Sequence, residues 1–240
     1  MTGSEPTGRT ALVVGVGPGL GWALAQRCAA AGLQVAVVAR GAARLQQLLD
    51  AAPSERIRPY ACDATDAAAV AGLFEAVQRD LGEPELVVYN AGAFQRASVL
   101  DITAEDFERC WRVGCLGGFL VGQAAARAMV ARAAGTIVFT GATASLRGSA
   151  HFANLAVPKF GLRALAQSMA RELGPAGVHV AHVIVDGQIE SERYRHLAAE
   201  RGPDALLAPA AIADTVWQLH GQHRSAWTQE LDLRPWTERF

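Results

Sequence analysis

A glycine-rich stretch near the N-terminus, VVGVGPGLG over Val13–Gly21, constrains the fold of this chain more than any other feature. An apolar run, Ala11–Val14, leads into it, and a helical pattern, Trp22–Ala31, follows it. In a unit of buried strand, glycine turn and helix, backbone N–H groups and the positive end of the helix dipole point at the same spot. The stretch therefore predicts a phosphate-binding turn, although a glycine-rich turn can also be purely structural.

Short apolar runs and helical patterns alternate along the rest of the chain. Apolar runs typical of buried strands lie at Val35–Ala39, Ile57–Ala61, Leu86–Tyr89, Thr136–Thr140, Val178–Val185 and Glu230–Leu233. Helical patterns lie at Gly41–Ala51, Asp66–Leu81, from the candidate N-cap Thr103 to about Arg132, Phe152–Leu173 and Pro209–His220. Because each crossover must pack back onto the sheet, this alternation predicts helices on both faces. We therefore expect an α/β fold: a single-domain, Rossmann-type, doubly wound parallel sheet of about seven strands.

The composition gives no support for a nucleic-acid or membrane partner. The 22 basic and 23 acidic residues leave a formal net charge of −1, so no attraction to phosphate backbones or anionic lipids is expected. Residues 1–9 are polar and lack the apolar segment of a secretory signal, and Leu116–Ala134 is broken by glycines, Gln123 and two arginines. We expect a cytoplasmic protein with a flexible N-terminus over 1–9 and one domain over 10–240.

The cysteines show no metal-binding or disulfide pattern. Cys28, Cys62, Cys110 and Cys115 form no C-x-x-C pair and have no histidine nearby at ligand spacing. Buried free thiols in a reducing compartment are therefore expected, and no metal site.

The end of the second predicted strand carries a signal for the type of nucleotide. A carboxylate at this place would bind the adenosine ribose of NAD, but no acidic residue occurs between Gly21 and Asp50. Arg40 stands there instead, and its planar guanidinium suits a 2′-phosphate. The sequence therefore favours NADP(H) over NAD(H); the alternative is an arginine that is merely solvated at a strand end.

The loops after the third and fourth predicted strands continue the pattern. Asp63 is placed to accept from an adenine amino group, and Asn90-Ala91-Gly92 supplies small residues where the backbone would pass a cofactor. These motifs, together with Gly15-x-x-x-Gly19-x-Gly21, Lys159 and Asp186-Gly187 in this order, resemble the short-chain dehydrogenase/reductase family. The resemblance covers nearly the whole chain and implies an oxidoreductase that binds a nicotinamide dinucleotide and a small-molecule substrate.

The resemblance also implies where the cofactor binds. The residues that it places at the cofactor are Gly15, Gly17, Gly19, Leu20, Gly21, Arg40, Asp63, Ala64, Asn90, Ala91, Gly92, Lys159, Asp186, Gly187 and Ile189. It further implies that the irregular, charged stretch over 186–208 covers the substrate. By the same resemblance, we expect a homodimer or homotetramer that packs through the helical regions 103–132 and 152–173.

The catalytic positions depart from the family pattern. In the family, a Tyr four residues before the Lys exchanges a proton with the substrate oxygen, and a Ser after the fifth strand binds that oxygen. An Asn on the fourth helix links the Lys to a proton-carrying water. This chain keeps Lys159 but has Leu155, Ala142 and Gly114 at those three positions. Since one general acid–base contribution is worth about 10²–10⁴-fold in rate, ordinary carbonyl reduction is expected to be lost or very slow.

Other polar groups near these positions are candidates for the missing proton donor. His151 can act as an acid, unless it only caps the next helix or faces solvent. Asp186 can bind a cationic substrate or stabilise positive charge in the nicotinamide ring, unless it only caps a loop. The sequence thus favours an NADP(H)-dependent oxidoreductase with a non-standard proton donor and with Lys159 and His151 as catalytic residues. Two alternatives stay open: a non-redox isomerase, lyase or cyclase on the same fold, and a cofactor-binding sensor without turnover.

Overall fold

Strand β1 (Thr10–Val14) shows why the sheet forms where it does. The computed structural model describes residues 9–237, apart from the side chains of residues 195, 198 and 199, so the predicted flexible N-terminus lies, except for residue 9, outside the described residues. In β1, Ala11 and Val13 pack into the core on one side of the sheet, and Leu12 and Val14 pack into the core on the other. A strand that is buried on both faces must be apolar at successive positions, which is why the strands of this chain are continuous apolar runs.

All the strands of the described sheet run parallel. They are β1, β2 (Gln34–Ala39), β3 (Ile57–Ala61), β4 (Pro84–Tyr89), β5 (Thr136–Thr140), β6 (His179–Val185) and β7 (Glu230–Leu233). Their spatial order is β3-β2-β1-β4-β5-β6-β7, so the direction of winding reverses between β1 and β4. In open parallel sheets, ligands bind at the carboxyl ends of the strands beside such a reversal. The predicted doubly wound sheet is thus confirmed, and the place of its ligand crevice is defined.

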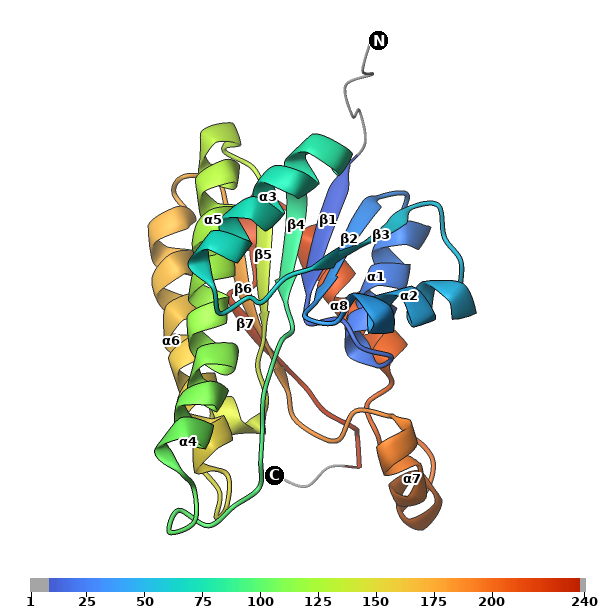
Figure 1. Ribbon diagram of the computed structural model, residues 1–240, viewed down its shortest axis with the longest axis vertical. Coiled ribbons are helices and arrows are strands. Elements are labelled where there is room, and N and C mark those ends of the chain that lie inside the picture. The colour runs from blue at the N-terminus through green and yellow to red at the C-terminus, as the bar shows by residue number, and fades with distance from the viewer. Residues whose placement is uncertain (1–8, 238–240) are drawn as a thin grey trace.

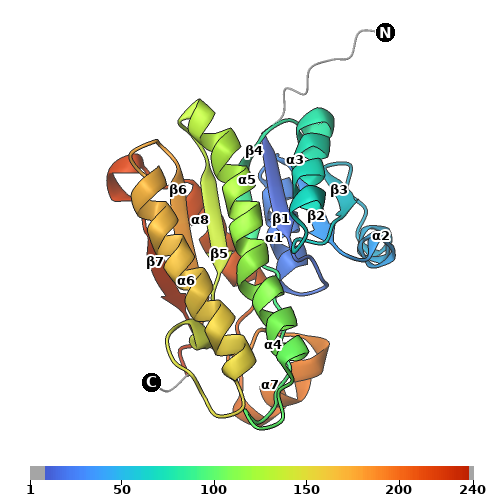
Figure 2. The same ribbon diagram turned by 60° about the vertical axis from the view of Figure 1, so that its left-hand side comes forward.

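Helices cover both faces of the sheet (Figure 1). They are α1 (Leu20–Ala30), α2 (Ala42–Ala51), α3 (Ala67–Leu81), α4 (Ala104–Trp111), α5 (Gly117–Arg132), α6 (Ala153–Leu173), α7 (Arg195–Arg201) and α8 (Pro209–His220). Helices α1 and α8 pack against one face, and α3, α5 and α6 lie across the other, as Figure 2 shows. The predicted helices are confirmed with ends displaced by one or two residues.

Two stretches differ from the sequence prediction. The helical region from Ala104 to Arg132 contains a π-helical turn, Arg112–Leu116, between α4 and α5. The Tyr89 hydroxyl donates a 2.5 Å hydrogen bond to the carbonyl of Val113 within this turn. A side chain from the end of β4 therefore helps to fix the π-helical turn. The stretch over 186–208, predicted to be irregular, contains the short helix α7.

The region Ala104–Arg132 is long and apolar enough, with a mean hydropathy of 1.4, to meet the length and composition criteria for a membrane span. Its small residues nevertheless face the core: a Cβ on Gly118 would lie 2.4 Å from Leu162, and one on Gly122 would lie 2.8 Å from Phe139. One side of this region therefore packs into the core of the domain, and 44% of its most apolar window is buried. Cys28, Cys62 and Cys110 are buried free thiols, as predicted, and Cys115 is only partly buried.

Candidate active site

The glycine turn after β1 is held against two other loops. The N–H groups of Gly15 and Val16 both donate to the carbonyl of Val38, at 2.9 and 3.0 Å. Gly15 has φ = +91°, and a Cβ at this position would lie 2.4 Å from the backbone nitrogen of Ala91. At Gly21 a Cβ would lie 2.7 Å from the carbonyl oxygen of Gly15. These two glycines are therefore required by close packing of the turn, independently of any ligand.

The other two glycines of the motif line open space. A Cβ at Gly19 would meet nothing within 4 Å, and one at Gly17 would meet only the guanidinium of Arg44, at 3.7 Å. Helix α1 begins at Leu20 with Gly19 as its N-cap and has no side-chain cap, so its first N–H groups lack a side-chain partner. Uncapped N–H groups at a helix N-terminus, facing open space beside an arginine, form a site for a phosphate.

A cavity of about 480 Å³ lies at the carboxyl ends of β1, β2, β3 and β4. It brings together the following residues predicted at the cofactor: Gly15, Gly17, Arg40, Asp63, Ala64, Asn90, Ala91 and Gly92. Arg44, Thr65 and Val113 line it as well. The Asn90 amide donates to the carbonyl of Gly15 at 3.0 Å, which fixes the loop after β4 against the glycine turn.

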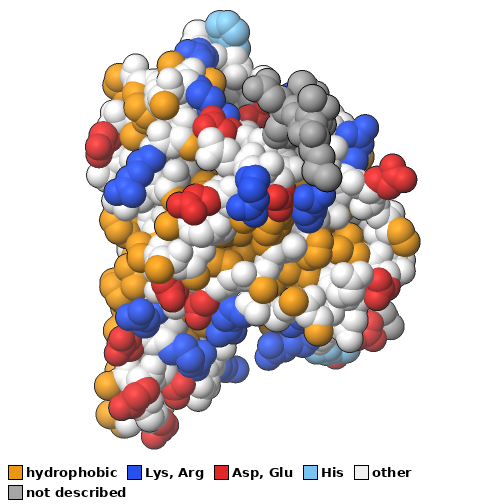
Figure 3. Space-filling view, turned by 45° about the horizontal axis from the view of Figure 1, so that its top comes forward, with side chains coloured by type: hydrophobic (Ala, Val, Ile, Leu, Met, Phe, Trp, Pro, Cys, Tyr) orange, Lys and Arg blue, Asp and Glu red, His pale blue; other side chains and the backbone are white. Residues whose placement is uncertain are grey.

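The charged groups that line this cavity are Asp63, Arg40 and Arg44. The Asp63 carboxylate accepts from the N–H and the hydroxyl of Thr65 at 2.9 and 2.8 Å through its Oδ1 atom. These hydrogen bonds, with a further contribution from the positive charge of Arg40, hold the pKa of Asp63 below its usual value. Arg40 and Arg44 are both exposed at the rim, where their guanidinium groups can bind an anion. Figure 3 shows basic and acidic side chains interspersed below the apolar band that crosses this face of the molecule.

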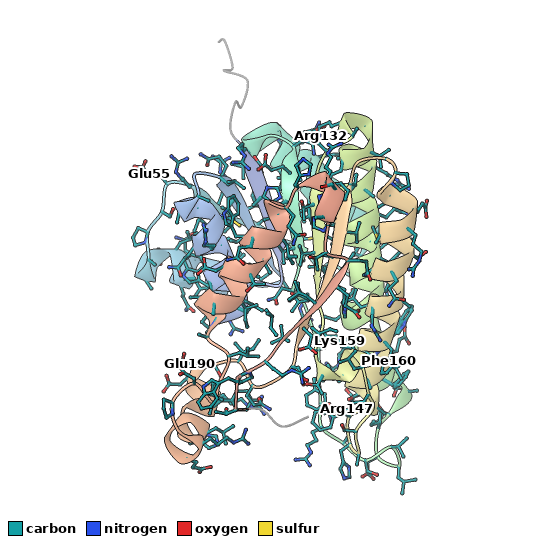
Figure 4. The ribbon with its side chains drawn as sticks, turned by 180° about the vertical axis from the view of Figure 1, so that it is seen from behind. Glu55, Arg132, Arg147, Lys159, Phe160 and Glu190 are labelled. Atoms are coloured by element: carbon teal, nitrogen blue, oxygen red, sulfur yellow. The ribbon has the colours of Figure 1, made fainter. Side chains whose placement is uncertain are left out.

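Lys159 is buried at the carboxyl edge of the sheet. It lies in the second turn of α6, and its Nζ atom donates to the carbonyl of Thr140, the last residue of β5, at 2.5 Å. Burial lowers the pKa of Lys159 to about 8. Figure 4 shows Lys159 at this edge, with Glu190 and α7 on the other side of the same edge.

The three positions at which the family carries its other catalytic groups hold no acid or base. Leu155 is partly exposed on the first turn of α6, and Ala142 follows β5. Gly114 is buried in the π-helical turn, where a Cβ would lie 2.7 Å from the Cβ of Pro158. Pro158 thus fills the space that a side chain at 114 would need. An asparagine does not fit there unless Pro158 is displaced or replaced by glycine.

A hydroxyl and a carboxylate meet beside these positions. The Thr143 hydroxyl donates a short hydrogen bond to Oδ1 of Asp186, which is 7% exposed. On the other side of Asp186, Nη2 of Arg234 lies 3.5 Å from Oδ2, and Arg234 also forms a bidentate ion pair with Asp232. Asp186 was predicted at the cofactor, but Thr143 was not, although the segment FTGATAS carries its hydroxyl next to Ala142.

A second group of polar side chains, which the sequence also did not predict, contacts the loop after β5. Arg163 binds Glu230 through two hydrogen bonds of 2.7 and 2.6 Å, and Nδ1 of His182 lies 3.0 Å from the same carboxylate. Burial lowers the pKa of His182 to about 4, so the ring is neutral and Nδ1 carries the proton. Its Nε2 atom lies 3.4 Å from the Ser145 hydroxyl, which accepts from the Ala142 N–H at 3.1 Å. Ser145 is fully buried and therefore belongs to this chain of contacts.

The remaining predicted residues lie at the ends of the loops around the site. His151 is exposed in the turn before α6, with φ = +69°, and its carbonyl accepts from the N–H of Ala97. Gly187 has φ = +153° and packs against Pro235 from the segment after β7. Ile189 forms a single parallel bridge with Leu207, which joins the two ends of the stretch that contains α7.

Comparisons with known proteins agree with this geometry. The family model for short chain dehydrogenase matches residues 9–202. A 3-oxoacyl-[acyl-carrier-protein] reductase MabA from Mycobacterium bovis is 36% identical over 222 residues, which is 91% of this chain and 86% of that protein. A short-chain dehydrogenase structure from Rhodopseudomonas palustris aligns with a TM-score of 0.81 at 38% identity, covering 95% of this chain and 99% of the other. A metagenomic short-chain oxidoreductase solved with NADP gives a TM-score of 0.81 at 26% identity, covering 98% and 100%.

The sheet order, the glycine turn and these matches define the class. The chain belongs to the short-chain dehydrogenase family. It is an oxidoreductase of this type, and its cofactor is a nicotinamide dinucleotide.

Proposed function

We propose that this protein is an NADP(H)-dependent reductase that transfers hydride to a small molecule without the tyrosine acid of its family. One observation carries the proposal: a cavity with two arginines at its rim lies at the carboxyl ends of β1 to β4, and the positions of the family's acid–base groups hold Gly114, Ala142 and Leu155. The cytoplasm is the expected location. A substrate that needs little or no help with a proton suits such a site.

The proposal assigns each cofactor residue a place. The N-terminus of α1, with Gly17, Gly19 and Leu20, would hold the pyrophosphate, and Gly15 and Gly21 set the shape of the turn. Arg40, helped by Arg44, would bind the 2′-phosphate, and Asp63 with Ala64 would bind the adenine. Farther along the edge, the backbone of Asn90, Ala91 and Gly92 would lie beside the nicotinamide ribose, which Lys159 would bind. The nicotinamide ring would lie near Asp186, Gly187 and Ile189. The cofactor when bound supplies hydride.

Replacement of Arg40 tests the preference for NADP. Arg40→Ala should weaken NADPH binding about 10- to 100-fold, because a hydrogen bond to a charged group contributes about 1.5–3 kcal/mol, and should leave NADH binding nearly unchanged. Titration calorimetry measures both dissociation constants. Arg79→Ala, which removes an exposed arginine of α3, is the matched control. Equal losses for NADPH and NADH, or no loss for either, would contradict the assignment of the 2′-phosphate to Arg40.

The relatives named as 3-oxoacyl-[acyl-carrier-protein] reductases suggest a carbonyl substrate, but the positions that would bind and protonate a carbonyl oxygen are apolar here. We therefore propose acceptors with an activated C=N or C=C bond. The test is NADPH oxidation under single-turnover conditions with matched ketones, iminium ions and enones. Tight NADPH binding without oxidation by any of them would favour the sensor, and conversion without a change in NADPH would favour the non-redox enzyme.

His151 is a candidate proton donor for acceptors that need a proton. Its exposed position on the turn before α6 means that it reaches a substrate only if the substrate extends to that turn. His151→Ala should therefore lower the rate of NADPH oxidation by neutral acceptors and leave the rate with permanent cations unchanged. A loss with both kinds of acceptor would point to a structural effect, for which the melting temperature is the control.

A further inference from the structure

The Thr143–Asp186 pair occupies the carboxyl edge of the sheet beside the vacant catalytic positions. Asp186 follows β6 directly, and its N–H donates to the carbonyl of Leu233 at the end of β7 at 2.7 Å. Thr143 lies one residue after Ala142 and three after Thr140, whose carbonyl binds Lys159. The pair is therefore fixed by backbone contacts at the edge where Lys159 is buried.

The hydrogen-bonding state of the pair decides what it can bind. The Thr143 proton is committed to Asp186, and a carboxylate only accepts hydrogen bonds. The pair thus offers acceptors and no donor. A carbonyl oxygen needs a donor, whereas a cation or an N–H group needs an acceptor. The pair is therefore unsuited to a ketone and suited to a positively charged nitrogen.

Two carboxylates share one arginine at this place. Asp186 and Asp232 share Arg234, so the three side chains together carry one negative charge. The ammonium group of Lys159 is directed at the Thr140 carbonyl. A cation bound at Asp186 would therefore pair with a carboxylate that shares its arginine with Asp232.

The apolar groups of the same edge suit an organic cation. Phe94, in the loop after β4, stacks on Phe152 at the start of α6 with ring centroids 4.8 Å apart. The amide of Asn154 donates to the carbonyl of Gln95 at 2.8 Å and holds that loop against α6. Aromatic faces attract organic cations, and Leu155 adds apolar surface on the next residue of the helix.

We propose that the substrate is a cationic C=N compound, an iminium ion or protonated imine, whose nitrogen is held toward Asp186; this inference rests on the proposed reductase function. The iminium carbon accepts hydride, the electron pair of the C=N bond becomes the lone pair of the amine nitrogen, and NADPH becomes NADP⁺. The charges balance without a proton from the protein. This reaction therefore does not require the tyrosine, serine and asparagine that the family uses.

Binding of a cation tests the site independently of turnover. The probe is 2-methyl-1,2,3,4-tetrahydroisoquinoline, protonated at pH 7, titrated into the complex with NADP⁺, with neutral 1-tetralol as the matched alcohol. The amine should bind at least about tenfold more tightly than the alcohol, and Asp186→Asn should abolish this difference. Asp214→Asn, which removes an exposed carboxylate that pairs with Arg27 on the α1–α8 side, should leave it unchanged. Thr143→Val should weaken amine binding less than Asp186→Asn does.

Turnover provides the second readout. NADPH oxidation should be at least about 100-fold faster with 2-methyl-3,4-dihydroisoquinolinium than with 1-tetralone, since only the ketone needs a proton donor. Equal rates, or an amine that binds Asp186→Asn as tightly as the wild type, would overturn the inference. If neither acceptor nor a matched enone is reduced, the proposed reductase function is wrong, and amine binding alone then decides whether Asp186 forms a cation site. Unchanged melting temperatures of the variants exclude unfolding as the cause.

Discussion

At the scale of single residues, the site is defined by contacts between positions far apart in the chain. Gly114 packs against Pro158, and Thr143 binds Asp186, although 43 or more residues separate the members of each pair. Local sequence shows the type of each residue and its distance from a motif. It does not show which distant side chain will fill the space or share the proton, and this is why Thr143 and the role of Pro158 were not predicted.

The contact between Gly114 and Pro158 leads to a prediction about stability. Gly114→Ala should lower the free energy of unfolding by about 1–3 kcal/mol, because its Cβ would lie 2.7 Å from that of Pro158 and the core must shift. Most of this loss should disappear when Gly114→Ala is made in a Pro158→Gly background, because glycine removes the Cβ at 158 that causes the 2.7 Å contact. Urea denaturation of the four proteins measures the coupling. Additive effects of the two substitutions would show that the contact is relieved elsewhere.

The buried ammonium of Lys159 leads to a prediction about pH. Its pKa is lowered to about 8 in the folded protein, against 10.5 for an ordinary lysine. Between these values the unfolded chain binds more protons than the folded one, so stability should rise with pH from about 8 to 10.5, by about 3 kcal/mol. Lys159→Met should remove this rise. Denaturation of the cofactor-free proteins at pH 7.5 and 10 tests it, and parallel curves would contradict it.

At the scale of elements, the sequence predicts most of the fold because each strand and helix carries its own periodic pattern. Strands β3, β5 and β7 and helix α8 occur at the predicted bounds. The π-helical turn was not predicted, because it depends on the Tyr89 hydroxyl and on glycines that pack against other elements. Helix α7 is seven residues long and lies in a charged stretch, so its own pattern is too short to be recognised.

The polar chain that joins β6, β7 and the loop after β5 should make stability sensitive to acid. The pKa of His182 is lowered to about 4, below the ordinary 6.5, so between these values the unfolded chain binds the extra proton. Its contribution is therefore present above pH 6.5 and should be lost as pH falls to about 4. His182→Gln should lose less stability over this window than the wild type, as measured by thermal denaturation at pH 7 and 5. An equal loss in both would show that other groups dominate.

At the scale of the whole molecule, the two long helices of one face leave large apolar side chains in solvent. Trp111 and Phe119 on α4 and α5, and Val157 and Phe160 on α6, are each between 37% and 47% exposed. Figure 2 shows α5 and α6 side by side on this face. Exposed apolar groups gathered on one face are typical of a contact with another protein surface, and a second copy of this chain is our proposal.

Phe119→Glu should accordingly reduce the mass of the assembly. We expect the wild type to elute as a dimer or tetramer and the variant as a smaller species, with NADPH binding unchanged, by size-exclusion chromatography with light scattering. Glu55→Lys, which changes a charge before β3, is the control. A monomeric wild type would contradict the proposal directly.

The packing of Gly114 against Pro158 also restricts how this chain can change by mutation. An asparagine at 114 is blocked while Pro158 is present, and the loss of Pro158 alone leaves a gap in the core. Introducing the full set of family catalytic groups by single substitutions therefore passes through a destabilised variant, and it also requires changes at Leu155 and Ala142. Gly114→Asn alone should therefore lower stability and restore no proton path, because Leu155 and Ala142 would still lack acid–base groups.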